Sequence, residues 1–267
     1  MVPGTLRFEQ VGPLARITLC HTHRFNAMTR LMWRELRVAF EHVQLSQDIR
    51  CVVVAGEGSH FCSGGDISEY AAFRFQEASL REFHEGDVWG GLQAMLDCDV
   101  PIVAQIAGNC MGAGVEIASC CDIRVSAQSA RFGAPIAKLG FPMAPREAAL
   151  VAREVGAVMA RQMLLEAALF GAHDLKAAGF LSRVVDDDAL DAEVQATALR
   201  IAALAPQAAR MNKQTLRELN QPLAGVSSGF SHHKKVVKST LNPYAYANSA
   251  EHREGIQAFL DKRKPAF

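Results

Sequence analysis

The chain has 267 residues, of which 49% are hydrophobic, and its 28 Lys and Arg balance its 28 Asp and Glu. A chain of this length can bury one large core, and its neutral charge argues against the basic excess typical of nucleic-acid binders. No window is apolar enough to span a membrane, and residues 1–10 lack the pattern of a signal peptide. We therefore expect a cytoplasmic protein with no nucleic-acid or membrane partner.

The seven cysteines form no CxxC pair and show no spacing of zinc ligands. This pattern favours buried reduced thiols and predicts no metal site. The histidines do not change that expectation, because the pair His232-His233 beside Lys234-Lys235 is typical of a solvated helix face.

The first elements along the chain are two strands and a helix. Short β-rich runs at residues 5–9 and 14–19 flank Gly12-Pro13, which predicts a hairpin at the start of a sheet. Apolar residues then recur at helical spacing over residues 31–43, and Thr29 stands where it can cap that helix.

Buried strands and further helices follow. Continuous apolar runs at 51–55 and 102–107 predict two strands buried on both faces, and 122–125 and 130–133 predict two short ones. The intervening stretch 66–96 is helical in character but weakly periodic. Strands that alternate with helices in this way predict an α/β fold around a mainly parallel sheet.

The composition changes at about residue 145, after which Ala and Leu dominate. Only residues 181–185 predict a strand in this part, and helix-forming segments follow one another to the C-terminus. We expect an α/β core over residues 1–200 and a helical C-terminal region over residues 201–267.

Two glycine-rich turns, at residues 56–67 and 108–118, each follow a buried strand, where the backbone can approach a ligand closely. The glycine spacing does not fit a dinucleotide-binding turn, and no Gly-Lys-Ser/Thr follows as in a P-loop. Ser63 does not stand in the G-x-S-x-G sequence of an α/β-hydrolase nucleophile.

The two turns can instead present backbone N–H groups to one oxygen. Gly65 and Ala113 each stand at or near a predicted helix start, where unpaired N–H groups favour a developing negative charge. Glu116 follows Ala113 by three residues, so its carboxyl lies on the same side of the helix. Most glutamates are solvated or ion-paired, but the neighbours Val115 and Ile117 are apolar, which favours a functional carboxyl in a buried helix.

Four segments in order carry a family resemblance: LCHTHRFNAM at 19–28, GEGSHFCSGGDISEY at 56–70, PIVAQIAGNCMGAGVEIASCCDIRVSA at 101–127 and EGIQAFLDKRKPAF at 254–267. They resemble the L-N-R-P-x-x-x-N-A-L segment, the two glycine-rich signatures and the usual ending of the enoyl-CoA hydratase/isomerase (crotonase) superfamily. In the first segment His21-Thr22 replaces the Arg-Pro of the family. The resemblance covers essentially the whole chain.

The resemblance implies a spiral of ββα units with a helical C-terminal trimerisation region, and a homotrimer or a dimer of trimers. It implies an acyl-CoA thioester as substrate, with coenzyme A as part of the substrate and no separate cofactor. Gly65 and Ala113 would then supply the oxyanion hole that holds the thioester oxygen, with Glu116 as a catalytic residue.

The same resemblance implies a set of substrate-binding residues. Segments 24–27 and 66–70, with Phe259 and Lys262 from the last helix, would lie near the nucleotide part of coenzyme A. For Lys262 a solvated C-terminal charge is an equal alternative. The full predicted set is Arg24, Ala27, Ser63, Asp66, Ile67, Gly112, Ile136, Phe141, Phe259 and Lys262.

The sequence departs from the family at the acyl end of the site. Hydratases of the family use two glutamates, because adding water to a conjugated double bond requires both a base and an acid. The second belongs to a P-E-x-x-L-G motif, whereas this chain has Pro135-Ile136-Ala137-Lys138-Leu139-Gly140. The aligned Ile136 cannot transfer a proton, and the following FPMAPREAAL lacks the G-x-G-G loop of the family.

Three interpretations follow. Glu116 alone could serve a hydratase with altered chemistry, an isomerase, a decarboxylase or a thioester hydrolase. Glu147 could replace the lost carboxyl, although a surface glutamate beside Arg146 is the more ordinary expectation. The protein could also bind acyl-CoA and be catalytically weak.

The acyl-chain preference is open. Five aromatic residues could line an apolar tunnel or belong to the core: Phe73, Phe75, Phe83, Trp89 and Phe141.

Overall fold

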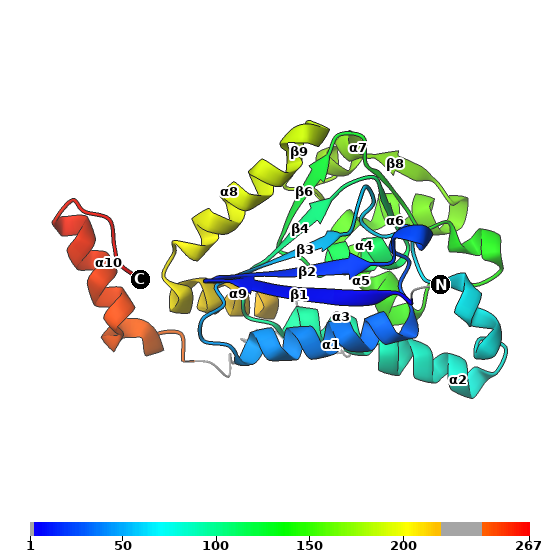
Figure 1. Cartoon of the computed structure of the whole chain (residues 1–267), viewed down its shortest axis with the longest axis horizontal. Coiled ribbons are helices and arrows are strands. Elements are labelled where there is room, and N and C mark those ends of the chain that lie inside the picture. The colour runs from blue at the N-terminus through cyan, green and yellow to red at the C-terminus, as the bar shows by residue number, and fades with distance from the viewer. Residues whose placement is uncertain (1–2, 220–241) are drawn as a thin grey trace, which may run out of the picture.

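The computed structural model describes residues 3–219 and 242–267, and the histidines at 232 and 233 lie outside them. Its centre is a six-stranded sheet in the order β1-β2-β3-β4-β6-β9 (Figure 1). The strands are β1 (Thr5–Val11), β2 (Leu14–Cys20), β3 (Cys51–Gly56), β4 (Ile102–Ile106), β6 (Ile123–Ala127) and β9 (Arg183–Val185). The β1–β2 pair is the predicted hairpin, and every other pair in this sheet is parallel. The prediction of a mainly parallel α/β sheet is confirmed.

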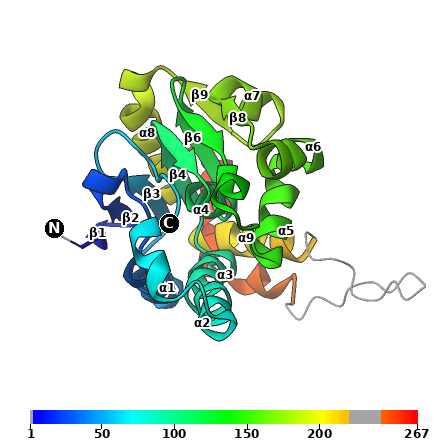
Figure 2. The same cartoon turned by 90° about the vertical axis from the view of Figure 1, so that its right-hand side faces the viewer.

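Helices cover both faces of this sheet (Figure 2). On β3, Cys51 and Val53 pack with one apolar cluster, which includes side chains of α8 (Leu190–Ala202), whereas Val52 and Val54 pack with the other. The second cluster includes α1 (Arg30–Leu45) and α3 (Trp89–Asp97). Alternate side chains of a strand point to opposite faces, so the continuous apolar run reflects burial on both sides.

The predicted cap of the first helix is confirmed, since the Thr29 side chain accepts a hydrogen bond from the Met32 N–H at 3.1 Å. The stretch after β3 forms a 3-10 helix at Ile67–Ala72, then α2 (Glu77–Glu82) and a π-helical segment at Phe83–Val88 that leads into α3. These short pieces of differing pitch explain the weak periodicity of the sequence there.

A second, three-stranded sheet has the order β5-β7-β8, with β5 (Asn109–Met111), β7 (Arg131–Gly133) and β8 (Leu169–Gly171). The run at 130–133 is therefore a strand as predicted, but it does not belong to the main sheet. Strands β5 and β8 were not predicted: β5 lies inside the second glycine-rich turn, and β8 falls in the Ala- and Leu-rich part of the chain, where the sequence favours helices. The remaining helices are α4 (Ala113–Ser119), α5 (Pro145–Val155), α6 (Ala157–Arg161), α7 (Ala172–Ala177), α9 (Pro206–Leu219) and α10 (Ala250–Leu260).

The two C-terminal helices differ in how they meet the core. Helix α9 is tied to it by ion pairs of Lys213 with Asp122 at 2.7 Å and of Arg217 with Asp99 at 2.8 Å. Helix α10 stands beyond the end of the sheet (Figure 1).

All seven cysteines are free thiols, and all except the partly exposed Cys20 are buried, which confirms the expectation of reduced, buried cysteines. Residues 3–219 and 242–267 contain no helix long and apolar enough to cross a membrane. The same residues hold no cluster of side chains suited to a metal ion.

Candidate active site

The two glycine-rich turns lie side by side. Cys62 and Cys110 form a parallel bridge, in which the Cys62 N–H donates to the Asn109 carbonyl at 2.9 Å and the Met111 N–H donates to the Cys62 carbonyl at 2.8 Å. The turn that follows β3 and the turn that leads into α4 are thus neighbours, although about fifty residues separate them in the chain.

Glycine is required where these turns meet. Gly64 and Gly112 have φ values of 115° and 48°, in the region that side chains disfavour. A Cβ atom on Gly114 would lie 2.7 Å from the Cys62 carbonyl oxygen, so only a glycine lets α4 approach the other turn this closely.

Gly65 and Ala113 both line a cavity of about 360 Å³. Ala113 is the first residue of α4, as predicted. Gly65 precedes Asp66, which caps the 3-10 helix Ile67–Ala72 by accepting from the Ser68 N–H at 3.0 Å. In the described part of the chain neither amide N–H has a hydrogen-bond acceptor, so both are free to bind a ligand oxygen.

Glu116 lies in the first turn of α4, a helix whose seven residues are all buried, and its own exposure is 7%. Its side chain makes no hydrogen bond to any residue that the structure describes. Burial, and then the negative charge of Glu147, raise the pKa of Glu116 well above its usual value. Burial therefore favours the protonated form of the Glu116 carboxyl, which can give a proton.

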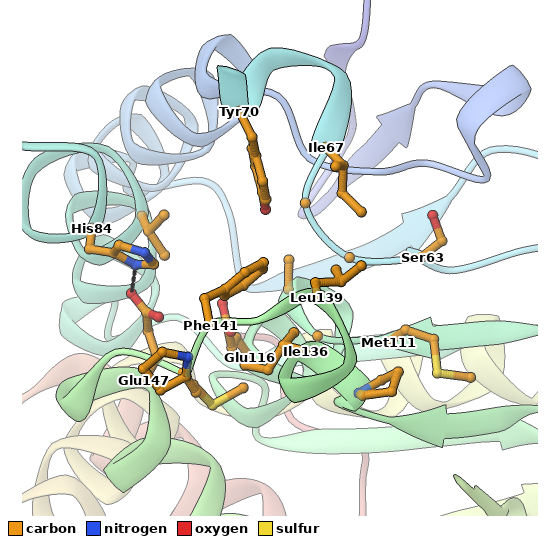
Figure 3. A pocket seen from close by; sticks show the side chains of 18 of the residues that line it. Ser63, Ile67, Tyr70, His84, Met111, Glu116, Ile136, Leu139, Phe141 and Glu147 are labelled. Atoms are coloured by element: carbon orange, nitrogen blue, oxygen red, sulfur yellow. Dashed lines mark hydrogen bonds and ion pairs between the residues drawn. The ribbon is translucent and has the colours of Figure 1, made fainter. Parts of the chain in front are cut away.

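Tyr70 projects into the same cavity (Figure 3). Its hydroxyl lies against Gly65, where a Cβ atom would overlap it. Burial raises the pKa of Tyr70 to about 12; the Arg74 charge opposes this shift, and Glu116 and Glu147 add to it. The hydroxyl thus stays protonated beside one of the two free amides.

Glu147 is not the surface residue that its neighbour Arg146 suggested. It is 3% exposed and lines the cavity that Glu116 lines. Its Oε1 lies 2.9 Å from His84 Nδ1, a contact drawn in Figure 3. The Arg146 guanidinium pairs with Glu85 instead, at 3.2 Å. Tertiary packing buries this first-turn glutamate of α5 because the helix turns it toward the interior and Arg146 outward.

The structure places five of the predicted substrate-binding residues on the cavity wall: Ser63, Ile67, Gly112, Ile136 and Phe141. The other five do not line it. Arg24 is exposed, and its carbonyl accepts from the Ser63 hydroxyl at 2.8 Å; Ala27 and Asp66 are buried. Phe259, 82% exposed, and the exposed Lys262 lie at the C-terminal end of the chain.

The Asn26 side chain, from the Asn-Ala part of segment 19–28, has a structural role. Its Oδ1 accepts from the His21 N–H at 3.0 Å, and its Nδ2 donates to the carbonyls of Glu57 and His60 at 2.8 and 2.7 Å. Asn26 is fully buried, so it joins the loop after β2 to the first glycine-rich turn rather than facing a ligand.

The cavity wall is mainly apolar. Of the five aromatic residues considered for a tunnel, Phe83 and Phe141 line it, Phe73 is buried in the core, and Phe75 is 83% exposed. Trp89 packs against the core and lies under the Arg146 guanidinium. Other apolar wall residues include Trp33, Ile67, Val88, Ile136, Leu139 and Met143.

Sequence reasoning missed His84 as part of the site, and it included Tyr70 only within segment 66–70, expected near the nucleotide part of coenzyme A, without giving it a role of its own. Both fall in the weakly periodic stretch 66–96, where no regular pattern indicates which side chains face inward. Tyr70 ends the quoted glycine-rich segment, which was the signal for its place near the ligand, but its contact with Gly65 is visible only in the folded structure.

Comparisons with known proteins show the family and the fold of the chain. The sequence profile of the enoyl-CoA hydratase/isomerase family matches residues 9–267. A probable enoyl-CoA hydratase of Mycobacterium bovis is 30% identical over 267 residues, covering 100% of this chain and 99% of that protein. A probable enoyl-CoA hydratase of Rhodobacter capsulatus is 32% identical, over 98% of this chain and 97% of its own.

Solved structures give the same result. An enoyl-CoA hydratase/carnitine racemase from Magnetospirillum magneticum superposes with a TM-score of 0.89 at 36% identity, covering 98% of this chain and 95% of that one. An enoyl-CoA hydratase from Mycobacterium smegmatis superposes with a TM-score of 0.83 at 25% identity, over 98% of each chain.

Fold and cavity thus define an α/β enzyme of the crotonase type, and the chain belongs to the enoyl-CoA hydratase/isomerase family. Within that family it is an acyl-CoA enzyme.

Proposed function

We propose that the cavity binds an acyl-CoA thioester and holds its carbonyl oxygen between the N–H groups of Gly65 and Ala113. The observation that carries this proposal is a pair of amide N–H groups on adjacent turns of one apolar cavity, neither of which has an acceptor among residues 3–219 and 242–267. Negative charge collects on the thioester oxygen when an enolate forms, so two fixed donors lower the barrier to its formation.

Glu116 would serve this oxyanion hole as a proton-transfer group. It follows Ala113 by one helical turn, it is buried, and its raised pKa favours the protonated carboxyl. A neutral acid at this place can protonate the α-carbon of an enolate.

The apolar Ile136 on the cavity wall favours a second candidate. Without a carboxyl at that position, the site could serve a decarboxylase or thioester hydrolase of the same fold, or an acyl-CoA-binding protein of weak activity. Mass spectrometry of the acyl group after incubation distinguishes these: loss of CO2, release of free coenzyme A, addition of water, or no change.

Hydration of crotonyl-CoA tests the main proposal. We expect turnover by the wild-type protein and a loss of about 100-fold or more in kcat for Glu116→Ala. Glu166→Ala, which removes an exposed glutamate, is the matched control. Robust hydration that survives Glu116→Ala would contradict the role of Glu116.

Assembly as a homotrimer or a dimer of trimers is part of the proposal. It is supported by apolar side chains that α10 exposes, with Ile256, Phe259 and Leu260 at 55%, 82% and 67%. Contact of Phe259 and Lys262 with the nucleotide part of coenzyme A, and a cytoplasmic location, stay predictions. Light scattering after gel filtration measures the assembly, and Lys262→Ala should weaken coenzyme A binding by a few-fold if the contact exists.

A further inference from the structure

Two buried glutamates reach one cavity from different helices. Glu116 comes from the first turn of α4 and Glu147 from the first turn of α5. Ile136, which stands at the Glu position of the P-E-x-x-L-G motif that this chain resembles, lines the same wall. The cavity therefore contains two carboxyl groups, although the sequence motif for the second one is absent.

His84 fixes the second of these carboxyl groups. Its Nδ1 lies 2.9 Å from Glu147 Oε1. It belongs to the π-helical segment Phe83–Val88, and such wide turns are frequent at functional sites. Figure 3 shows the His84 ring and the Glu147 carboxyl joined at one side of the cavity, with Glu116 and Tyr70 around the same space.

We propose that Glu147, oriented by His84, is the second proton-transfer group of this site and that Glu147 and Glu116 hold one proton between them. The proposal rests on the proposed acyl-CoA function and deepens it, because it assigns the group that Ile136 cannot supply.

The surroundings of the two carboxyl groups differ. Two carboxylates in one apolar cavity do not both ionise readily. Glu147 lies in the first turn of α5 and contacts the His84 ring, while Glu116 has no hydrogen-bond partner in the described part of the chain, so we assign the role of base to Glu147 and that of acid to Glu116. Tyr70 and Arg74 also line the cavity. The Arg146 guanidinium forms its ion pair with Glu85 and not with Glu147.

The pair can complete the addition of water. The Glu147 carboxylate takes a proton from water as the water oxygen bonds to the β-carbon of the enoyl thioester. The electron pair of the double bond moves to the thioester oxygen, and the resulting enolate takes the Glu116 proton at its α-carbon. One proton remains on the pair, now on Glu147, and its return to Glu116 restores the starting state.

Hydration of crotonyl-CoA by four variants tests the pair, with crotonyl-CoA binding and thermal unfolding measured alongside. We expect Glu147→Gln to lower kcat by about 100-fold or more with binding unchanged, and to remove the acidic limb of the pH profile of kcat/KM. His84→Asn keeps a donor near Glu147 and should lose less than tenfold, whereas His84→Ala should lose more and shift that limb. Glu85→Gln, beside His84 but with a half-exposed side chain, is the control.

The outcomes separate the two proposals. If the wild-type protein neither binds nor changes crotonyl-CoA, the proposed function fails. If Glu147→Gln hydrates crotonyl-CoA at the wild-type rate, the proposed function stands, and the proposal that Glu147 is the second proton-transfer group is wrong. If the wild-type protein binds crotonyl-CoA without hydrating it, the proposal that Glu147 and Glu116 act together in hydration is also overturned. If Glu147→Gln does not fold, the two His84 variants decide: equal rates and equal pH profiles in both would overturn the proposal.

Discussion

Replacing Glu116 by Gln should stabilise the protein at neutral pH while it removes activity. Burial raises the pKa of Glu116 well above the value of 4.5 that an exposed glutamate has. Below pH 4.5 the carboxyl is protonated in the folded and the unfolded chain alike, so it does not affect stability. Above that pH the unfolded chain ionises first and the folded chain keeps its proton, so stability falls as the pH rises.

The size of the effect follows from one proton. Stability falls by about 1.4 kcal/mol for each pH unit between the unfolded and the folded pKa. A Gln side chain is uncharged and nearly isosteric with the protonated acid. The Glu116→Gln variant therefore does not lose stability as the pH rises. For a chain of this size each pH unit in that window corresponds to roughly 3–6 °C in Tm.

Thermal unfolding at fixed protein concentration, followed by circular dichroism from about pH 4.5 to 7.5, measures the difference. We expect the Tm values of wild type and Glu116→Gln to be close at the acidic end and to diverge as the pH rises. Glu166→Gln, at an exposed position, should follow the wild type throughout. A pH-independent difference, or a Glu116→Gln variant that is less stable at neutral pH, would refute the reasoning.

Three other changes give clear expectations. A Cβ atom at Gly65 would overlap the Tyr70 hydroxyl, so Gly65→Ala should lower kcat for crotonyl-CoA by about 100-fold or more, and adding Tyr70→Phe should recover part of it. Equal losses in the single and double variants would show that the overlap is not the cause. Ile136→Glu adds a carboxyl to a cavity that already holds two, so we expect a lower Tm at neutral pH and no faster hydration; a tenfold or larger gain, about 1.4 kcal/mol, would instead identify position 136 as the defect. Burial raises the pKa of Cys62 and Cys121 to about 12, so a thiol reagent should modify the partly exposed Cys20 first in the native protein. A fast phase that persists in Cys20→Ser would contradict this order.

The buried strands and the two glycine-rich turns could be predicted because they depend on local patterns. Continuous apolar runs indicated strands buried on both faces, and β3 and β4 are such strands. Glycines directly after those strands indicated turns that approach a ligand, and Gly65 and Ala113 do line one cavity. Glu116 could be recognised because the whole helix around it is apolar, so its burial was already evident in the sequence.

The rest of the site depends on contacts between distant segments. Glu147 stands beside Arg146, which suggested a surface position, and only the packing of α5 against α4 turns it inward to His84, which is 63 residues away. Tyr70 and His84 come from short helices of unequal pitch that leave no readable period. The sequence by itself therefore determined the family, the sheet and the buried position of Glu116. The buried position of Glu147 was decided by the tertiary structure, because burial depends on the folded surroundings of a residue and not on the residue itself.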